Sequence, residues 1–484
     1  MSTLWQRYGL RRNPFFQEPL ADDGDGPELK DFFTGRAKDL ATAMTQLTHD
    51  EQTRVVLLGA PGVGKTTLLN RLLSNVRQPD GLRVGWIVAS LPPINLPKAA
   101  TLQDFCIEVL RHVLDMRRQL QTERESDGRA AKATTTRIAR SAKKALLPGT
   151  SLWERIERTV EGALTLSPQV LGIGVTTQFT APYTGAAMWM PLTTQALGQL
   201  ALDAGRDLVF AINNAENLRD DIAERATSVL SEARELFLTP HTHWVFAGTP
   251  DFFESVIRPR RQLSGIMGYP VVLPPLDDTG VEELITRRYA ALKLPHVPFI
   301  PPITARDAGA LARTFVGDLR ELLRALEMTV VRLAPVRSGT VNLIDAMMVI
   351  GIEQAELFRD AMTGAAWEHL MRVVLAPSRD GSIIQRFREA DAVRVLAPMR
   401  QPTVNAHKKA WLAAGLIRPD GRTGAAEWFT VTGEALLAML PAALARGITP
   451  EAFLSGRDLA VESPTSTSVS RPPAKNVTQP RRRK

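Results

Sequence analysis

The sequence predicts an α/β fold in which helices cover both faces of a parallel sheet. Two observations lead to this prediction: short apolar runs alternate with helical patterns, and a glycine-rich loop joins the first run to the helix that follows it. Alternating strands and helices favour parallel pairing, because each helix carries the chain back across the sheet. The runs expected to be strands are 54–58, 82–89, 208–212, 244–247 and 271–273. The helical patterns between them are 37–49, 68–75, 102–120 and 220–237.

After residue 276 the sequence predicts a mostly helical organisation. Amphipathic helical patterns fill 277–350, and a helix-rich block with a strand pair near its end follows over 367–440. We expect this division: a lead-in over 1–35, an α/β core over 36–276, a helical unit over 277–360, a further domain over 361–445 and a tail over 461–484. The tail is rich in Ser, Thr, Pro and Arg, so disorder is expected there.

Two inserts interrupt the expected core. Residues 121–150 are polar and basic, which predicts a loop or a weak helix. Residues 162–202 carry no charge, and within them 168–190 are expected to form short strands or a hairpin. A buried hairpin and a surface for a partner protein are the two interpretations of the uncharged insert.

Composition restricts the class of protein. The chain has 484 residues, of which 44% are apolar and 23% charged, as in ordinary globular proteins. Its single cysteine, Cys106, excludes an intramolecular disulfide and suits a reducing compartment. The N-terminus lacks the apolar segment of a signal peptide, and Pro, Gly and Thr interrupt 162–202 too often for a membrane span. We therefore expect a cytoplasmic protein that does not associate with membranes.

The positive charge is concentrated in two segments. The net charge is +8, and the segments 128–144 and 471–484 each carry six basic residues and no acidic one. The rest of the chain is therefore mildly acidic. Basic segments of this kind suit an anionic polymer, nucleic acid first, although a solvated linker and a solubilising tail are the alternative.

The glycine-rich loop carries the clearest functional motif. Residues 59–67 read GAPGVGKTT, which matches G-x-x-x-x-G-K-T between a strand and a helix. In such a loop backbone N–H groups surround phosphate oxygens, Lys65 reaches the β and γ phosphates, and Thr66 offers its hydroxyl to Mg²⁺. The expected ligands are ATP or ADP with Mg²⁺. The expected binding residues here are Gly59, Ala60, Pro61, Gly62, Val63, Gly64, Lys65, Thr66 and Thr67.

Two asparagines stand where nucleotide hydrolases carry two acids. Residues 211–218 read AINNAENL, which puts Asn213 at the first position and Asn214 at the second. Asn213 can accept a hydrogen bond from a magnesium-bound water but adds no negative charge, so with Thr66 it would hold Mg²⁺ only weakly. Asn214 cannot act as a base, and loss of a general base typically costs about 10²–10⁴ in rate.

Glu216 is the nearest acid to these asparagines. It is either a helix-start residue or a partial substitute for the missing base. We expect nucleotide binding with slow or absent hydrolysis, and the sequence leaves open whether the protein is an ATPase.

Several further motifs, in their order along 8–335, resemble those of AAA+ proteins. FTGR at 33–36 resembles the adenine-side box. The strand WVFAGTP resembles sensor 1, with Thr249 at its tip, and GDLRELLRAL resembles the sensor-2 helix, with Arg320 at the arginine position. IRPRRQLSG lies where that family carries its arginine finger, with Arg258, Arg260 and Arg261 as the candidates.

The resemblance is closest to the origin-recognition and STAND-like branch. The opening YGLRRNPFF also resembles related bacterial ATPases that regulate transposition or defence. The resemblance implies an AAA+ P-loop NTPase sheet with a helical lid over 277–360, followed by a winged helix-turn-helix domain. It implies assembly through the AAA+ interface and nucleotide contacts by Asn213, Asn214 and Arg320. Catalytic roles would fall to Glu216, Thr249, Arg258 and Arg261.

The C-terminal block has the pattern of a winged helix. Residues 401–417, QPTVNAHKKAWLAAGLI, predict a helix, and the following RPDGRTGAAEWFTVT predicts a hairpin. The helix would enter the major groove of duplex DNA, and the hairpin would meet phosphates. The expected DNA contacts are Lys408, Lys409, Arg418 and Arg422. Docking of a partner protein is the alternative for this fold.

Three functions fit these observations. The first is a nucleotide-dependent switch that recruits DNA or a partner, such as an enzyme that acts with it. The second is an active motor or loader in replication, transposition or antiphage defence, using Glu216 or a residue of a neighbouring subunit. The third is a scaffold in which nucleotide is structural. The seven histidines lack metal-ligand spacing, so no zinc site is expected.

Overall fold

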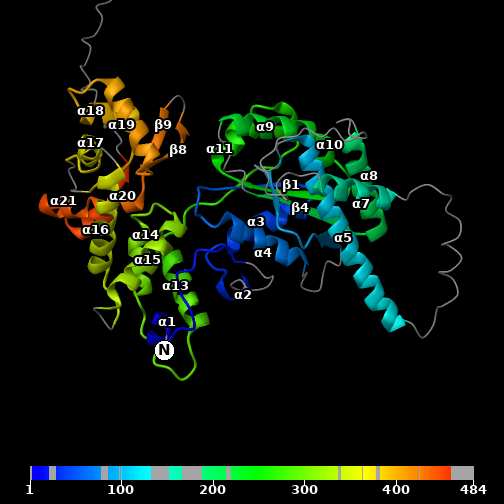
Figure 1. The fold of residues 1–484 in the computed structure, drawn as a ribbon, viewed down its shortest axis with the longest axis horizontal. Helices are drawn as coiled ribbons and strands as arrows, with labels where there is room; N and C mark the ends of the chain where they lie inside the picture. Colours follow the sequence, from blue (N-terminus) through cyan, green and yellow to red (C-terminus); the bar gives the residue numbers. More distant parts are fainter. Residues whose placement is uncertain are drawn as a thin grey trace, which may run out of the picture.

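The computed structural model divides into an α/β part and a mostly helical part (Figure 1). The N-terminal lead-in crosses from one part to the other. The residues that the structure describes are 3–20, 29–77, 85–96, 99, 101–131, 152–165, 188–213, 220–335, 339–361, 364–377, 382–423 and 426–458.

A parallel sheet forms the centre of the α/β part, as the sequence predicts. The strands follow the order β2-β4-β5-β1-β6, and β3 pairs with β4 beyond the end of β2. All these pairs are parallel. The strands are β1 (Arg54–Leu58), β2 (Trp86–Val88), β3 (Ile94–Asn95), β4 (Asp207–Asn213), β5 (Thr242–Gly248) and β6 (Val271–Val272).

Alternating side chains on β4 and β5 separate two apolar layers. Phe210 and Trp244 face one layer, which also holds residues of α5 and α7 to α10. Val209 and Val245 face the other layer, with residues of α3 and α4. Successive strand residues point to opposite faces, so both faces of the central strands are buried. The covering helices are α3 (Ala37–Leu47), α4 (Lys65–Arg77), α5 (Leu102–Ala131), α7 (Leu152–Thr165), α8 (Trp189–Ala204), α9 (Asp220–Glu232) and α10 (Arg234–Phe237).

Three local predictions for this part need correction. Helix α5 continues to Ala131, so the helix expected over 102–120 is longer than predicted, and the first part of 121–150 is helical, which is one of the two interpretations given for it. The expected hairpin over 168–190 is wrong at its end, where α8 begins at Trp189, and its residues 168–187 lie outside the described residues. The expected helix over 220–237 ends at Glu232 and resumes at Arg234, since Ala233 is not helical.

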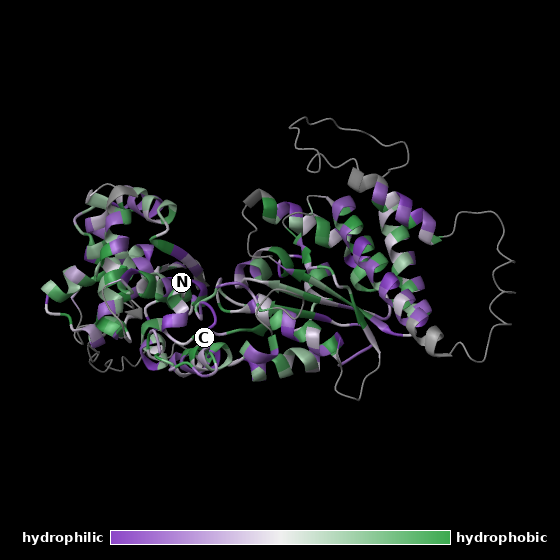
Figure 2. Cartoon of the chain, turned by 60° about the horizontal axis from the view of Figure 1, so that its bottom comes forward, coloured by the Kyte–Doolittle hydropathy of each residue, from purple (hydrophilic) through white to green (hydrophobic). Residues whose placement is uncertain are grey.

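The hydrophobic colouring follows this layering (Figure 2). The helices around the sheet carry both hydrophilic and hydrophobic residues, as amphipathic helices do. Among the described residues, no helix combines the length and hydrophobicity needed to cross a bilayer.

The second part contains the lead-in, the expected lid and the C-terminal block. A four-stranded sheet in the order β10-β7-β9-β8 belongs to the C-terminal block. Its strands are β7 (Ile384–Arg388), β8 (Ile417–Thr423), β9 (Ala426–Val431) and β10 (Arg457–Asp458). The helices of the lead-in and the lid are α1 (Leu4–Arg7), α2 (Leu29–Phe32), α13 (Asp278–Leu292), α14 (Ala305–Ala312), α15 (Leu319–Leu333) and α16 (Leu343–Ala361). Those of the C-terminal block are α17 (Gly364–Val374), α18 (Glu389–Val395), α19 (Gln401–Ala413), α20 (Gly433–Ala438), α21 (Leu440–Ala445) and α22 (Pro450–Leu454).

These three segments share one hydrophobic core. Phe15 of the lead-in, Phe315 beside the lid helices and Phe429 of the C-terminal block belong to the same buried cluster. The sequence division at 360 therefore does not separate independent cores, whereas the division at 35 separates the lead-in, which belongs to this core, from the two apolar layers of the α/β part. Apolar residues of the lead-in, which look like a linker in isolation, are buried against the lid.

Candidate nucleotide-binding site

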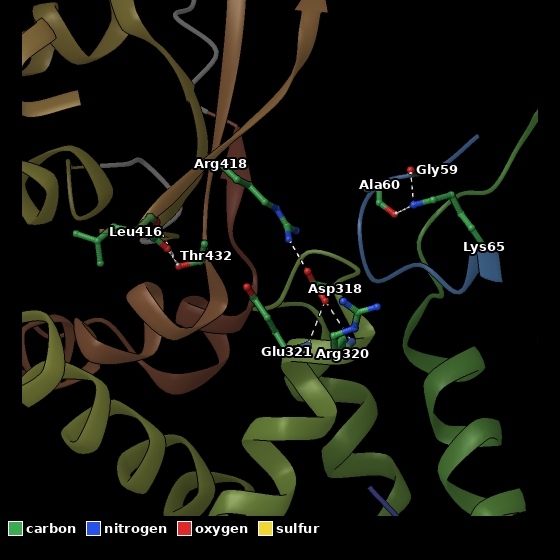
Figure 3. A network of polar contacts seen from close by, with 10 residues as sticks. Gly59, Ala60, Lys65, Asp318, Arg320, Glu321, Leu416, Arg418 and Thr432 are labelled. Carbon is green, nitrogen blue, oxygen red and sulfur yellow. Dashed lines mark hydrogen bonds and ion pairs between the residues drawn. The ribbon is translucent and has the colours of Figure 1, made fainter. Parts of the chain in front are cut away.

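The glycine-rich loop lies at the carboxyl end of β1, and α4 begins at Lys65. Gly62 and Gly64 have φ angles of 78° and 94°, a region that favours glycine. The Lys65 ammonium is buried and donates to the carbonyls of Gly59 and Ala60 at 3.0 and 2.9 Å (Figure 3). The loop and its lysine thus form one compact unit at the amino terminus of α4.

A cavity opens between this loop and the expected lid. It encloses about 860 Å³ of space, part of it open to solvent. Its lining comes from three regions: the loop, the lead-in and the lid helices. The residues are Gln17, Glu18, Pro19, Leu20, Phe32, Phe33, Thr34, Arg36, Gly62 to Thr67, Leu276, Leu284, Arg288, Leu319, Arg320 and Leu323.

Asn213 ends β4 beside the loop. Its amide nitrogen lies 3.3 Å from the Thr66 hydroxyl oxygen, and the residue is 8% exposed. The structure thus brings together the two residues expected at the magnesium site. Asn214 and Glu216 lie outside the described residues.

Asn95 is a neighbour that sequence reasoning missed. It pairs with Asn213 in register, so both side chains project from the same face of the sheet. Its side-chain oxygen is buried without a hydrogen-bond partner among the described residues. Oxygens of Asn95, Asn213 and Thr66 fit a hard cation such as Mg²⁺, but all three are neutral, so the fit is a weak one.

Thr249 follows β5, the strand between β1 and β4. This places it at the same edge of the sheet as the loop and Asn213. Its hydroxyl accepts from the Phe252 N–H at 3.3 Å and caps the short helix α11 (Pro250–Phe252). A structural cap therefore accounts for this threonine in the described conformation.

Arg258, Arg260 and Arg261 lie on the outside of the α/β part. They are exposed and surround the end of a π-helical turn, η3 (Phe253–Ile257), and the start of α12 (Arg261–Ser264). Arg258 contacts both carboxylate oxygens of Glu254, at 2.7 and 2.8 Å. None of the three lines the cavity of its own chain.

Arg320 lines the cavity from the first turn of α15. The residue is exposed, and no hydrogen bond or ion pair of its guanidinium is found among the described residues. Asp318 caps the same helix, because its Oδ1 accepts from the N–H groups of Arg320 and Glu321, both at 3.1 Å. The cap fixes the backbone from which Arg320 enters the cavity.

Comparison with known proteins agrees with this geometry. Residues 48–256 match the family model described as an AAA domain. Over these residues the chain is similar to an AAA domain, and this segment is called the AAA domain below. No curated protein matches the sequence.

Solved structures resemble the chain only distantly. The ORC1 protein of Aeropyrum pernix in complex with DNA is 14% identical, with 86% of this chain and 95% of that chain covered, at a TM-score of 0.41. The ORC2 protein of the same organism is 12% identical, with coverage of 90% and 99% and a TM-score of 0.42. A Walker-type ATPase of Pyrococcus abyssi is 13% identical, with coverage of 88% and 99% and a TM-score of 0.45. These values are too low to assign a function.

The lead-in forms one wall of the cavity beside the AAA domain. A buried arginine of α13, which the sequence analysis did not single out, holds this wall in place. Arg288 of α13 donates to the carbonyls of Pro14 and Phe16 at 3.0 and 2.9 Å, and its guanidinium lies 3.8 Å from the centre of the Phe16 ring. Burial lowers the pKa of Arg288 to about 9. Arg288 lies four residues after Leu284 and therefore on the apolar stripe of α13. This spacing is the sequence signal that could have predicted a buried side chain at 288.

Arg36 of the FTGR motif also holds the walls of the cavity. It is 6% exposed and donates to the carbonyls of Val63 and Pro274, at 3.0 and 2.6 Å. Asn70 of α4 donates to the Leu20 carbonyl at 2.8 Å. These contacts join the lead-in to α4, and they join Arg36 to the phosphate loop and to the segment after β6.

Two of the four expected DNA contacts are paired within the chain. Lys408 forms an ion pair with Glu389 and lies 5.2 Å from the centre of the Phe429 ring. Arg418 was expected to contact DNA phosphate from the hairpin, but it pairs with Asp318 of the lid at 2.8 Å. Lys409 is exposed. The side chain of Arg422 lies outside the described residues.

Proposed function

We propose that this protein is a nucleotide-dependent switch. It binds ATP or ADP in the cavity between the AAA domain and the α13–α15 lid, and the bound nucleotide sets the position of the C-terminal block. The observation that carries the proposal is the shared lining of the cavity, because the phosphate loop and the lid residue Arg320 face the same space. A ligand that touches both parts can favour one arrangement of the two.

In this function the protein acts in the cytoplasm. It binds magnesium weakly and hydrolyses the bound nucleotide slowly. Thr66 and Asn213 would hold Mg²⁺ through neutral oxygens, and Asn95 would add a third. When bound, the cation neutralises phosphate charge. Because these groups carry no negative charge, the bound nucleotide is expected to persist rather than to be consumed quickly.

The output is binding of duplex DNA or a partner protein by the C-terminal block. The element order α17, β7, α18, α19, β8, β9 supports a winged helix-turn-helix, because a hairpin follows the second helix of a close helix pair. The basic segments 128–144 and 471–484 support an anionic partner. The resemblance of the sequence motifs to the origin-recognition and STAND-like branch also supports this output.

An active motor is the second candidate. The exposed cluster of Arg258, Arg260 and Arg261 favours it, since these cations could reach the site of a neighbouring copy in a homo-oligomer. Phosphate release would then depend on assembly, with Glu216 or a residue of the neighbour as the base.

Nucleotide binding and turnover, measured with and without duplex DNA, test these functions. We expect Lys65→Ala to weaken ATP and ADP binding about 10–100-fold, because the variant cannot form the charge-assisted hydrogen bonds to phosphate. The exposed lysine variant Lys38→Ala is the matched control and should bind normally. Unaltered binding by Lys65→Ala would remove the proposal.

Turnover separates the two candidates. The wild type is expected to bind nucleotide yet release phosphate slowly, and Asn213→Asp/Asn214→Glu is expected to raise the rate by about 10²–10⁴ in the presence of Mg²⁺. Rapid phosphate release by the wild type that disappears in Lys65→Ala would favour the motor instead.

A further inference from the structure

A carboxylate of the lid packs directly against the phosphate loop. Asp318 is 7% exposed. A Cβ added at Gly62 would lie 2.1 Å from its Oδ1, so the glycine leaves space that the Asp318 side chain fills. This contact joins the first turn of α15 to the loop that would hold the phosphates.

The partner of this carboxylate comes from the C-terminal block. Arg418 of β8 donates to Asp318 Oδ2 at 2.8 Å, and the two side chains are 21% and 9% exposed (Figure 3). Two hydrogen bonds from Thr432 hold the backbone before Arg418. The Thr432 hydroxyl donates to the Gly415 carbonyl at 3.1 Å, and the Thr432 N–H donates to the Leu416 carbonyl at 2.9 Å. Arg418 therefore follows a segment of the C-terminal block that is hydrogen-bonded to Thr432.

Negative charge is concentrated at this junction. Glu321 stands in the same turn of α15 as Asp318, and burial, followed by the nearby Asp318 charge, raises the pKa of Glu321 to about 7. A phosphate held by the loop would add further negative charge next to Asp318. Arg418 supplies the positive charge that offsets it, and removing one partner of a buried ion pair is costly because the other stays buried and unpaired.

We propose that Arg418 is a positioning residue of the nucleotide site that acts through Asp318 from the C-terminal block. Its charge lets the lid close on a phosphate-bearing loop, so nucleotide binding and docking of β8 on the lid stabilise each other. This inference rests on the proposed nucleotide binding. By reciprocity, a molecule that draws β8 away from the lid weakens nucleotide binding by the same factor.

The dissociation constant of ADP tests this role in the full chain. We expect Arg418→Gln to weaken ADP binding about 5- to 150-fold, the usual range of coupling between sites. Arg394→Gln changes an exposed arginine of the same block and should bind ADP like the wild type. Arg418→Lys, which keeps the charge, should lose less than Arg418→Gln and serves if the glutamine variant does not fold.

A double variant distinguishes this role from general stabilisation. Asn caps a helix about as well as Asp, so Asp318→Asn removes the charge and keeps the cap. Asp318→Asn/Arg418→Gln is expected to recover most of the ADP affinity that Arg418→Gln loses. Normal ADP binding by Arg418→Gln and Arg418→Lys, or no recovery in the double variant, would overturn the inference and leave the proposed function standing. Failure of the wild type to bind ADP would overturn both.

Discussion

The pKa of a single side chain, Glu321, depends on the contact between the lid and the C-terminal block. Its carboxyl lies among Asp318 and Arg324 of its own lid segment and Arg418 and Glu434 of the C-terminal block. Burial raises the pKa to about 7, so the folded protein holds this group protonated at a pH where the unfolded chain has released the proton. The cost of burying a charge there is avoided by neutralisation.

This shift predicts that stability falls as the pH rises. The folded pKa lies above the unfolded value of about 4.5, so the contribution of Glu321 is complete below that value and is lost as the pH passes through about 7. Glu321→Gln is expected to raise the melting temperature at pH 8 and to leave it nearly unchanged at pH 4.5. Glu282→Gln changes an exposed carboxyl, so the difference between its melting temperatures at pH 8 and at pH 4.5 should equal that of the wild type. A lower melting temperature of Glu321→Gln at pH 8 would show that Arg418 stabilises the charged form.

At the scale of elements, two glycines let helices of the C-terminal block approach the lid. A Cβ at Gly351 of α16 would lie 2.3 Å from the Leu437 carbonyl of α20. A Cβ at Gly433, at the start of α20, would lie 2.3 Å from the Phe315 ring. At Gly351 the lid thus meets the backbone of the C-terminal block, and at Gly433 that block meets a ring beside the lid helices, which explains why the expected boundary at 360 does not divide the core.

A side chain at Gly351 should disturb this junction. Gly351→Val is expected to lower the free energy of unfolding by about 1–3 kcal/mol or more, because a backbone carbonyl cannot move aside as a flexible side chain can. Gly198 lies in α8 with open space around its Cβ position, so Gly198→Ala should be neutral or add up to about 1 kcal/mol. Urea unfolding followed by circular dichroism measures both. Equal midpoints for Gly351→Val and the wild type would show that the junction contributes little.

At the scale of the whole molecule, the cavity lies where three parts of the chain meet. The AAA domain supplies the phosphate loop, the lid supplies Arg320, and the lead-in supplies a wall that Arg288 and Asn70 hold. Because the lead-in, the lid and the C-terminal block share a core, a change in the angle of the lid would carry the C-terminal block with it. This arrangement is what a switch requires.

Charge distribution gives the prediction that belongs to this scale. With Lys408 and Arg418 paired to acidic residues, duplex DNA binding should depend largely on the basic segments. Deleting 459–484 is expected to weaken DNA binding and to reduce the salt slope by about 0.9 for each phosphate that the tail neutralises. Lys409→Ala removes one exposed cation of α19 and should lower the slope by about 1 at most. A tail deletion with an unchanged slope would place the DNA-binding residues elsewhere.

The sequence by itself determined the features that depend on short spacing. The phosphate loop and the neutral residue at 213 each lie within a few consecutive residues, and each strand or helix of the alternating pattern is recognised from its own short stretch, where local backbone chemistry decides the outcome. The AAA domain and its parallel sheet were predictable for that reason. Only the tertiary structure decided the rest: the lead-in as a cavity wall, the shared core, Asn95 beside Asn213, and Arg418 turned toward the lid. Asp318 and Arg418 are 100 residues apart in the chain. Nothing in the local pattern around either residue specifies the other, because such pairs depend on how whole elements pack.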